Sequence, residues 1–142
     1  MSRSSRVVLD IGAGIRPFRG ATHAVDRATK RELEEELQAT RRSRPRVRYK
    51  TNWNVLTRGI PLPDDSVDKV VSRFTGNIVP AVLDEVDRVL KSGGTVQFTT
   101  PTEYAEGFKK LLEGEGMLNV RISNVYDPNR NTALKYLTAT KP

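Results

Sequence analysis

Cysteine is absent from this 142-residue chain, and histidine occurs only once. Without cysteine the chain cannot form disulfides, thiolate zinc sites or a nucleophilic thiol. A single histidine also excludes a His-rich metal centre, so no metal site is predicted. No apolar run approaches the roughly 18 residues that a membrane span needs, and Asp10 cuts the first apolar segment too short for the core of a signal peptide. These absences predict a cytoplasmic protein that is free of cross-links and does not associate with a membrane.

Acidic residues are fewer than basic ones, 17 against 24, and the formal net charge is +7. The excess lies in residues 1–60 and is densest in one basic stretch: Arg41, Arg42, Arg44, Arg46, Arg48 and Lys50. Such a stretch attracts nucleic acid or an acidic partner through counterion release and long-range steering. A solvated edge that only aids solubility explains the same residues equally well.

Nothing in the sequence divides the chain, because it has no internal repeat, low-complexity tract or interdomain linker. A chain of this length suits one domain that buries roughly 70% of the surface its unfolded form exposes. We therefore predict a single domain over residues 1–142.

Short apolar segments alternate with amphipathic ones, which is typical of an α/β protein. The predicted strands are residues 6–11, 23–26, 47–53, 69–74, 95–100, 119–126 and 132–140. The predicted helices are residues 28–42, 81–91 and a segment from residue 102 to the glycines at 114 and 116. Five residues join the last two strands, and so short a connection allows only an antiparallel pair.

Three local features support these helices. Thr29 and Glu32 have the spacing of a capping box at the start of the first. Gly93 and Gly94 are expected to end the second in a left-handed conformation. Tyr104 is expected to face the core from the third, and a core role is also predicted for Tyr126 and Tyr136.

Ligands of such sheets bind beyond the carboxyl ends of the strands, where the strand order reverses. The residues predicted at these ends are Asp10, Gly12, Ala13, Gly14, Asp26, Arg27, Asn52, Asn54, Ser72, Arg73 and Phe74. Glycines permit a tight turn with N–H groups facing a ligand, and a carboxylate that ends the second strand can accept both hydroxyls of a ribose. Asp26 follows Gly14 by only 12 residues and a third glycine is missing, which disfavours a nicotinamide dinucleotide. The same glycines and Asp26 are also explained by a purely structural turn and a surface carboxylate that bind no ligand.

Four segments in order resemble the class I S-adenosylmethionine-dependent methyltransferase family along nearly the whole chain. They are residues 8–14 (VLDIGAG), 24–26 (AVD), 60–71 (IPLPDDSVDKVV) and 83–94 (LDEVDRVLKSGG). The resemblance implies a Rossmann-like three-layer α/β sandwich around a mostly parallel seven-stranded sheet with an antiparallel C-terminal strand. It also implies an enzyme that binds S-adenosylmethionine, or S-adenosylhomocysteine, and transfers a methyl group.

The resemblance assigns cofactor-binding roles to these positions: Asp10, Gly12, Ala13, Gly14, Asp26, Arg27, Asn54, Val55, Ser72 and Arg73. Residues 10–14 would line the amino-acid part of the cofactor and Asp26 its ribose. Arg27, Asn54 and Val55 would lie near the adenine, and residues 72–73 would border the methyl-transfer crevice. It assigns no catalytic residue.

The sequence departs from the family pattern in four places. The loop from Gly14 to His23 is too short for the usual first helix, and Asn54 stands where the family often has an acid. We also expect no N-terminal extension and no insertion before the final hairpin, the segments that in the family usually cap the cofactor and shape the substrate pocket. A second copy of the chain or a partner subunit could supply that lid.

Two functions of different class therefore stay open. One is a methyltransferase, and the other is a non-catalytic methyltransferase-like module whose basic stretch binds nucleic acid or an acidic partner. If the chain is an enzyme, the absence of cysteine excludes methylation of pyrimidine C5 through a thiol adduct. Residues 72–77 (SRFTGN) lack the Asp/Asn-Pro-Pro-aromatic clamp of enzymes that methylate nucleic-acid amines. The acceptor atom could belong to a hydroxyl, an amine or a carboxylate.

Overall fold

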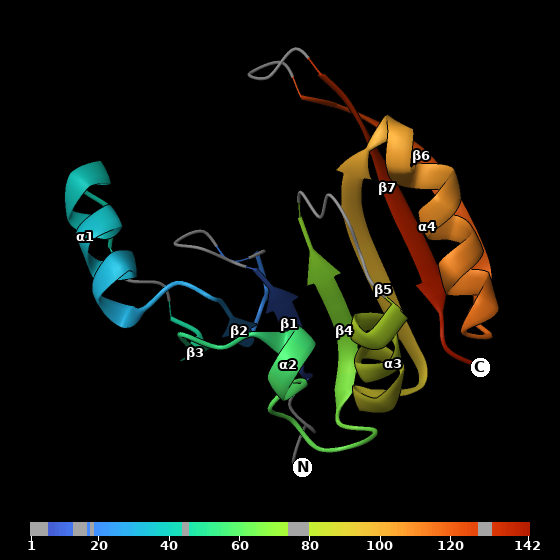
Figure 1. Ribbon diagram of the computed structural model, residues 1–142, viewed down its shortest axis with the longest axis horizontal. Helices are drawn as coiled ribbons and strands as arrows, with labels where there is room; N and C mark the ends of the chain where they lie inside the picture. Colours follow the sequence, from blue (N-terminus) through green and yellow to red (C-terminus); the bar gives the residue numbers. More distant parts are fainter. Residues whose placement is uncertain (1–5, 13–16, 18, 44–45, 74–79, 128–131) are drawn as a thin grey trace.

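Seven strands form one sheet in the order β3-β2-β1-β4-β5-β7-β6 (Figure 1). The computed structural model describes residues 6–12, 17, 19–43, 46–73, 80–127 and 132–142. The strands are β1 (Val8–Ile11), β2 (His23–Val25), β3 (Arg48–Lys50), β4 (Val67–Ser72), β5 (Leu90–Pro101), β6 (Leu118–Asp127) and β7 (Thr132–Thr140). Strands β1 to β5 pair in parallel, and β7 runs antiparallel to both β5 and β6. The predicted Rossmann-like α/β fold with a reversed C-terminal strand is confirmed.

The helices are α1 (Lys30–Thr40), α2 (Val55–Arg58), α3 (Pro80–Val89) and α4 (Thr102–Gly114). Helices α2, α3 and α4 lie on the same side of the sheet, whereas α1 stands beyond its β3 edge (Figure 1). The Thr29–Glu32 capping box at the start of α1 is present as predicted. Among the described residues of the β1–β2 connection, which are 12, 17 and 19–22, none is helical.

The hydrophobic core lies between the sheet and helices α2 to α4. Leu9, Val70 and Phe98 enter it from adjacent strands, and each is at most 1% exposed. Phe108 of α4 packs against Phe98 with ring centroids 4.9 Å apart. Removing such side chains from water stabilises the fold by about 1.5–3 kcal/mol each. This packing holds the sheet rigidly enough to position the residues at its strand ends.

Several local predictions are wrong. Helix α3 ends at Val89 rather than at the predicted Lys91, because Leu90 already pairs with Val67 of β4 and is fully buried. Gly93 and Gly94 therefore lie within β5, where the register with β4 shifts, and do not cap a helix.

Tyr104 is 45% exposed, and Ala105 takes the expected place in the core. Tyr136 is only partly buried, and the side chain of Tyr126 lies outside the described residues. The third strand is also shorter than predicted, and the short helix α2 that follows it was not predicted. Among the described residues, no helix combines the length and the apolarity that a membrane crossing requires.

Candidate cofactor-binding site

The strand order reverses between β1 and β4, and this is where α/β sheets bind ligands. The register places Ile11 opposite Val25 of β2, and Asp10 opposite Val71 of β4. The residues that follow these strands, Gly12, Asp26 and Arg73, therefore share one edge of the sheet. The structure thus brings together predicted site residues from three separate segments.

The backbone at this edge is held by hydrogen bonds between strands. The Gly12 N–H donates to the Val25 carbonyl at 2.9 Å, and the Ser72 hydroxyl donates to the Ile11 carbonyl at 3.0 Å. Gly12 has a φ of +72°, and no atom from elsewhere in the described structure lies within 4 Å of where its Cβ would be. Only glycine adopts this conformation without strain. The turn after β1 is therefore left-handed and open on the side where a side chain would stand.

Asp10 and Arg73 link β1 to β4 at the same edge. Arg73 Nη2 lies 3.8 Å from Asp10 Oδ2, and the Asp10 side chain is 1% exposed against 34% for Arg73. A buried carboxylate needs a cation or strong hydrogen bonds to offset its lost hydration. Arg73 supplies positive charge to Asp10 and still reaches solvent at the edge.

Asp26 directly follows β2, and a local turn holds its carboxylate. Its Oδ1 accepts a hydrogen bond from the Ala28 N–H at 2.8 Å, and its carbonyl accepts one from the Trp53 N–H at 3.0 Å. The side chain is half-buried, while that of the neighbouring Arg27 is exposed. The carboxylate thus has a defined orientation at a solvent-accessible strand end, as ribose recognition would require.

The remaining predicted residues take different positions. The Asn54 carbonyl accepts hydrogen bonds from two N–H groups of α2, which places this residue just before that helix. Val55 is 8% exposed and belongs to the hydrophobic core, so only its backbone could face a ligand. Ala13 and Gly14 lie outside the described residues.

The basic stretch is exposed wherever the structure describes it, which is at Arg41, Arg42, Arg46, Arg48 and Lys50; Arg44 lies outside the described residues. It extends from the end of α1 to β3, the edge strand of the sheet. Burial, and then the charge of Arg48, lower the pKa of His23 on the adjacent strand. The edge strand is therefore positively charged on one side.

A cation–aromatic cluster that the sequence pattern did not predict lies beside this stretch. Arg58 lies over the Trp53 ring at 3.8 Å from its centroid, and Lys50 does so at 5.3 Å. The Trp53 ring N–H donates to the Gly59 carbonyl at 2.7 Å, which fixes the indole. The three side chains come from β3, α2 and the loop between them, so no helical or strand spacing indicated the cluster. It adds Arg58 to the positive surface near the candidate site.

Within the described part of the chain, no group of three or more His, Cys, Asp or Glu side chains could hold a metal ion. The site therefore consists of two carboxylates, an arginine and a left-handed glycine turn at the reversal of a Rossmann-like sheet. A family model described as methyltransferase domain matches residues 9–98, which is more than half of the chain. The chain belongs to this methyltransferase family, and the resemblance to class I S-adenosylmethionine-dependent methyltransferases is confirmed.

Solved structures share the fold at low sequence identity. A Haemonchus contortus phosphoethanolamine N-methyltransferase 2, in complex with phosphomonomethylethanolamine and S-adenosylhomocysteine, superposes with a TM-score of 0.71 at 16% identity. The match covers 100% of this chain but 50% of that one, so this chain spans half the length of the Haemonchus enzyme.

A Thermotoga maritima methyltransferase, described as a possible histamine N-methyltransferase, gives a TM-score of 0.72 at 16% identity, with coverage of 99% and 84%. A chain in the complex of the Haloferax volcanii Trm112 methyltransferase activator gives 0.71 at 16%, with coverage of 96% and 82%. No curated protein matches this chain in sequence.

Proposed function

We propose that this protein is an S-adenosylmethionine-dependent methyltransferase with an acceptor yet to be identified. The observation that carries the proposal is the meeting of Gly12, Asp26 and Arg73 at the strand-order reversal of a chain in the methyltransferase family. Three of the similar solved structures contain S-adenosylhomocysteine or S-adenosylmethionine, which supports the same ligand here.

The residues present fit such a ligand. The left-handed turn at Gly12 leaves space for close approach to the backbone, and Asp26 offers carboxylate oxygens to ribose hydroxyls. Asp10, Ala13 and Gly14 would line the amino-acid part, and Arg27 and Asn54 the adenine. Ser72 and Arg73 would border the crevice that receives the acceptor.

When bound, the cofactor supplies an electrophilic methyl group on a positively charged sulfur. Transfer from such a group depends mainly on holding the acceptor in line with it. We therefore propose that this chain binds the cofactor, orients the acceptor and excludes water. The hydrogen bond from the Ser72 hydroxyl to the Ile11 carbonyl joins the two strands that border the proposed crevice. Domain boundaries at residues 1 and 142 and a cytoplasmic location stay predictions.

Calorimetric titration with S-adenosylmethionine, and then with S-adenosylhomocysteine, tests the proposal directly. We expect binding with a Kd in the micromolar range, which corresponds to roughly −8 kcal/mol. Absence of heat at millimolar ligand, for a protein shown to be folded by circular dichroism, would contradict it. Acceptor screening should begin with RNA because of the basic stretch.

A second function, a non-catalytic module that binds nucleic acid, is favoured by the exposed basic stretch and by Arg58 over Trp53. Binding of a labelled single-stranded RNA should weaken steeply with salt, and Arg42→Gln with Arg48→Gln should reduce that slope. An Arg31→Gln variant, at an exposed position on α1, is the control. A flat salt dependence would remove nucleic acid from the candidates.

A lid from a second copy or a partner subunit also belongs to the proposal. The described residues of the β1–β2 connection form no helix over the site, and one structure of similar fold comes from a complex with a methyltransferase activator. Light scattering on the eluted protein, with and without cofactor, would reveal a homodimer.

A further inference from the structure

An open hollow lies at the β3 edge of the sheet, on the face that carries α2 (Figure 1). Two cross-strand rows line it. Leu9, His23 and Arg48 form one row, because each is the pairing partner of the next, and Val25 with Lys50 forms the second. Leu9 and Val25 belong to the hydrophobic core, so the side chains of both rows project from the same face. The hollow therefore opens on a face of the sheet, whereas the candidate cofactor site lies beyond its strand ends.

The lining of this β2–β3 hollow combines apolar residues with positive charge. The loop after α2 contributes Pro61 and Leu62, and of the described residues that line the hollow none is acidic. Arg48 and Lys50 are exposed, and no described carboxylate forms an ion pair with either. The hollow has a volume of about 140 Å³, and because a water molecule takes about 30 Å³ of liquid, a group with the four oxygens of a phosphate fits. A small anion that enters from solvent therefore meets two cations.

Arg58 adds a third cation beside the hollow. Arg58 and Lys50 both lie over the ring of Trp53, at 3.8 and 5.3 Å from its centroid, and no described carboxylate pairs with Arg58. The hydrogen bond from the Trp53 ring N–H to the Gly59 carbonyl holds the ring in place. Two positive charges over one ring repel each other, and a negative group beside them offsets this repulsion. The cluster therefore favours an anion over a neutral ligand.

His23 contributes a ring nitrogen to the hollow. Its Nδ1 lies 2.8 Å from the Thr22 hydroxyl, which is itself tied to the backbone of Val8, whereas Nε2 has no hydrogen bond within the described chain. Burial, and then the charge of Arg48, lower the pKa of His23. The charged side chains that face it from the lining are those of Arg48 and Lys50, because β1 and the loop after α2 contribute apolar ones. A bound anion would favour the protonated ring and gain Nε2–H as a donor.

We propose that the β2–β3 hollow binds the phosphate group of a phosphorylated ligand, with Arg48 and Lys50 as the cations that contact its oxygens and His23 as a further donor. A phosphate is favoured over a carboxylate because it carries more charge and directs oxygens toward donors from two strands and not one. The phosphate belongs either to a small phosphomonoester or to the backbone of a nucleic acid. The inference goes beyond the proposed methyl transfer and does not depend on it.

The chain offers a built-in reporter for this site. His23 is the only histidine, so its ring proton resonances are identified without ambiguity. In an NMR titration of the full chain with inorganic phosphate at constant ionic strength, we expect these resonances to shift with half-saturation at about 1–10 mM. The pKa of His23, read from the same resonances, should rise when phosphate is bound. Sodium chloride at equal ionic strength should give no saturable shift.

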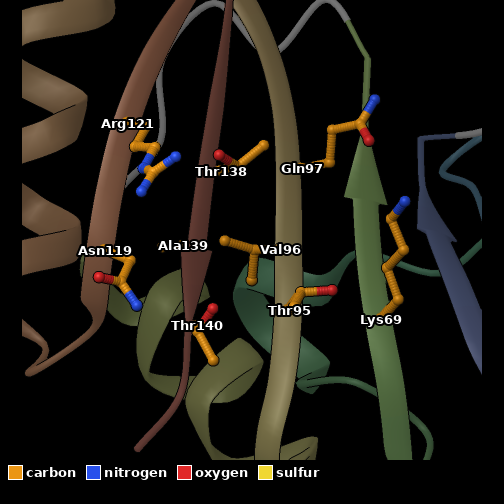
Figure 2. Close-up of a pocket in the computed structure, with 9 residues that line it drawn as sticks. All are labelled: Lys69, Thr95, Val96, Gln97, Asn119, Arg121, Thr138, Ala139 and Thr140. Carbon is orange, nitrogen blue, oxygen red and sulfur yellow. The ribbon is translucent and has the colours of Figure 1, made fainter.

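Arg48→Gln should weaken phosphate binding at least about tenfold, since a hydrogen bond to a charged group is lost together with its charge. Figure 2 shows where the matched control lies, in a larger hollow of about 430 Å³ on the opposite face of the sheet, with α3 behind the strands. Arg121 lines that hollow and is exposed, as Arg48 is in the first. Arg121→Gln removes the same charge from the chain and should change the affinity less than about twofold.

A second variant guards against misfolding of the first. Lys50→Gln should weaken phosphate binding about fivefold even if Arg48→Gln does not fold. A phosphate titration that gives no saturable shift beyond that of sodium chloride would overturn the proposal. So would equal losses in Arg48→Gln and Arg121→Gln, or no loss in either Arg48→Gln or Lys50→Gln.

Two further probes separate the sources of the phosphate. Methyl phosphate that shifts the His23 resonances at lower concentration than an oligouridylate assigns the hollow to a small phosphomonoester. Tighter binding of the oligouridylate, lost in Arg48→Gln, assigns it to a nucleic-acid backbone. Because none of these readouts involves S-adenosylmethionine, their outcome is separate from that of the proposed methyl transfer.

Discussion

Asp10 and Arg73 form an ion pair across the point where the strand order reverses, with 3.8 Å between Oδ2 and Nη2. The pair joins the two strands that border the candidate site, and its carboxylate is almost completely buried. A buried carboxylate destabilises the fold when the cation that offsets its lost hydration is removed. The same arrangement that positions the proposed site therefore also affects the stability of the sheet.

Removing Arg73 should destabilise the protein more when Asp10 is charged. We expect Arg73→Gln to lower the free energy of unfolding by about 1–3 kcal/mol, and to cost much less in an Asp10→Asn background. Urea denaturation of the two single variants and the double variant measures this coupling. Additive effects would show that the two side chains do not interact energetically.

Loss of the Asp26 charge should weaken cofactor binding without unfolding the chain. Asp26→Asn keeps an oxygen that can accept the hydrogen bond from Ala28 N–H but removes the charge. We expect calorimetric affinity for S-adenosylmethionine to fall by at least about tenfold, since hydrogen bonds to a charged group contribute about 1.5–3 kcal/mol. Asp65→Asn, at an exposed loop position with a φ of +52° that Asn tolerates, is the matched control. Equal affinity of the Asp26 variant and the wild type would refute the ribose role.

Gly59 should not tolerate a side chain. Its φ is +73°, and a Cβ there would lie 2.3 Å from Glu85 Oε1, the atom that accepts the Ile60 N–H. We expect Gly59→Ala to destabilise the protein by about 2 kcal/mol or more. Gly107→Ala, in the exposed middle of α4 with open space around it, should instead stabilise by about 0.5–1 kcal/mol. Urea midpoints that move in the same direction would contradict this pair of predictions.

Arg88 should not be replaceable by lysine. Its guanidinium donates to both oxygens of Glu85, to Asp64 and to the carbonyls of Ile60 and Leu62. Hydrogen bonds to Glu85 and then to Asp64 raise the pKa of Arg88 and keep it charged. Lysine lacks the planar fork, so Arg88→Lys should cost about 1–3 kcal/mol in thermal or urea unfolding.

Arg31→Lys is the control for that variant. Arg31 is 89% exposed and pairs only with Glu35 on its own helix among the interactions described, so its replacement should change stability little. A similar loss in both variants would mean that the Arg88 fork contributes nothing specific to the loop at 59–65.

Glu115 should make stability depend on pH near neutrality. Burial, a hydrogen bond with Asp84 and the charges of Asp84 and Asp87 raise its pKa from 4.5 to about 7. Between these two values the folded chain holds a proton that the unfolded chain has lost, so stability falls as pH rises through this window. Below pH 4.5 the raised pKa of Glu115 no longer changes stability with pH and its stabilising effect is fully present. Above pH 7 this stabilising effect is fully lost.

Glu115→Gln should therefore be more stable than the wild type at pH 8, by about 1 kcal/mol because the side chain keeps partial solvent contact. It should also show a flatter pH profile of Tm. Glu113→Gln, at an exposed position in the last turn of α4 just before Glu115, should leave the slope unchanged. A wild-type Tm that is constant from about pH 5 to 7 would contradict the raised pKa.

Interactions between near neighbours in the chain could be predicted correctly. The capping box of Thr29 and Glu32 depends on residues three apart, and the glycine turn after β1 depends on the conformational freedom of Gly12. The antiparallel pairing of β6 and β7 followed from a connection too short for a crossover. The motif order was also sufficient to indicate the family and the sheet.

Predictions failed where distant residues compete with local preference. Gly93 has the left-handed φ of a helix cap, but Leu90 gains more from burial beside Val67 than from a further turn of α3. Tyr104 has the spacing of a core residue, yet Ala105 occupies the core at that turn. Val67 is far from Leu90 in the chain, and the local spacing around residue 104 does not show which of two neighbouring side chains faces the core.

The linear order of residues was enough for most of the elements, for the antiparallel C-terminal strand and for the list of candidates at the strand ends, because caps, turns and hydrophobic periods act over a few positions. The ion pair of Asp10 with Arg73, the cations over Trp53 and the row of His23 with Arg48 required the folded chain. These contacts depend on strand order and register, which backbone hydrogen bonds and core packing set across the whole sheet. A shift by one residue would turn every side chain of a strand to the opposite face.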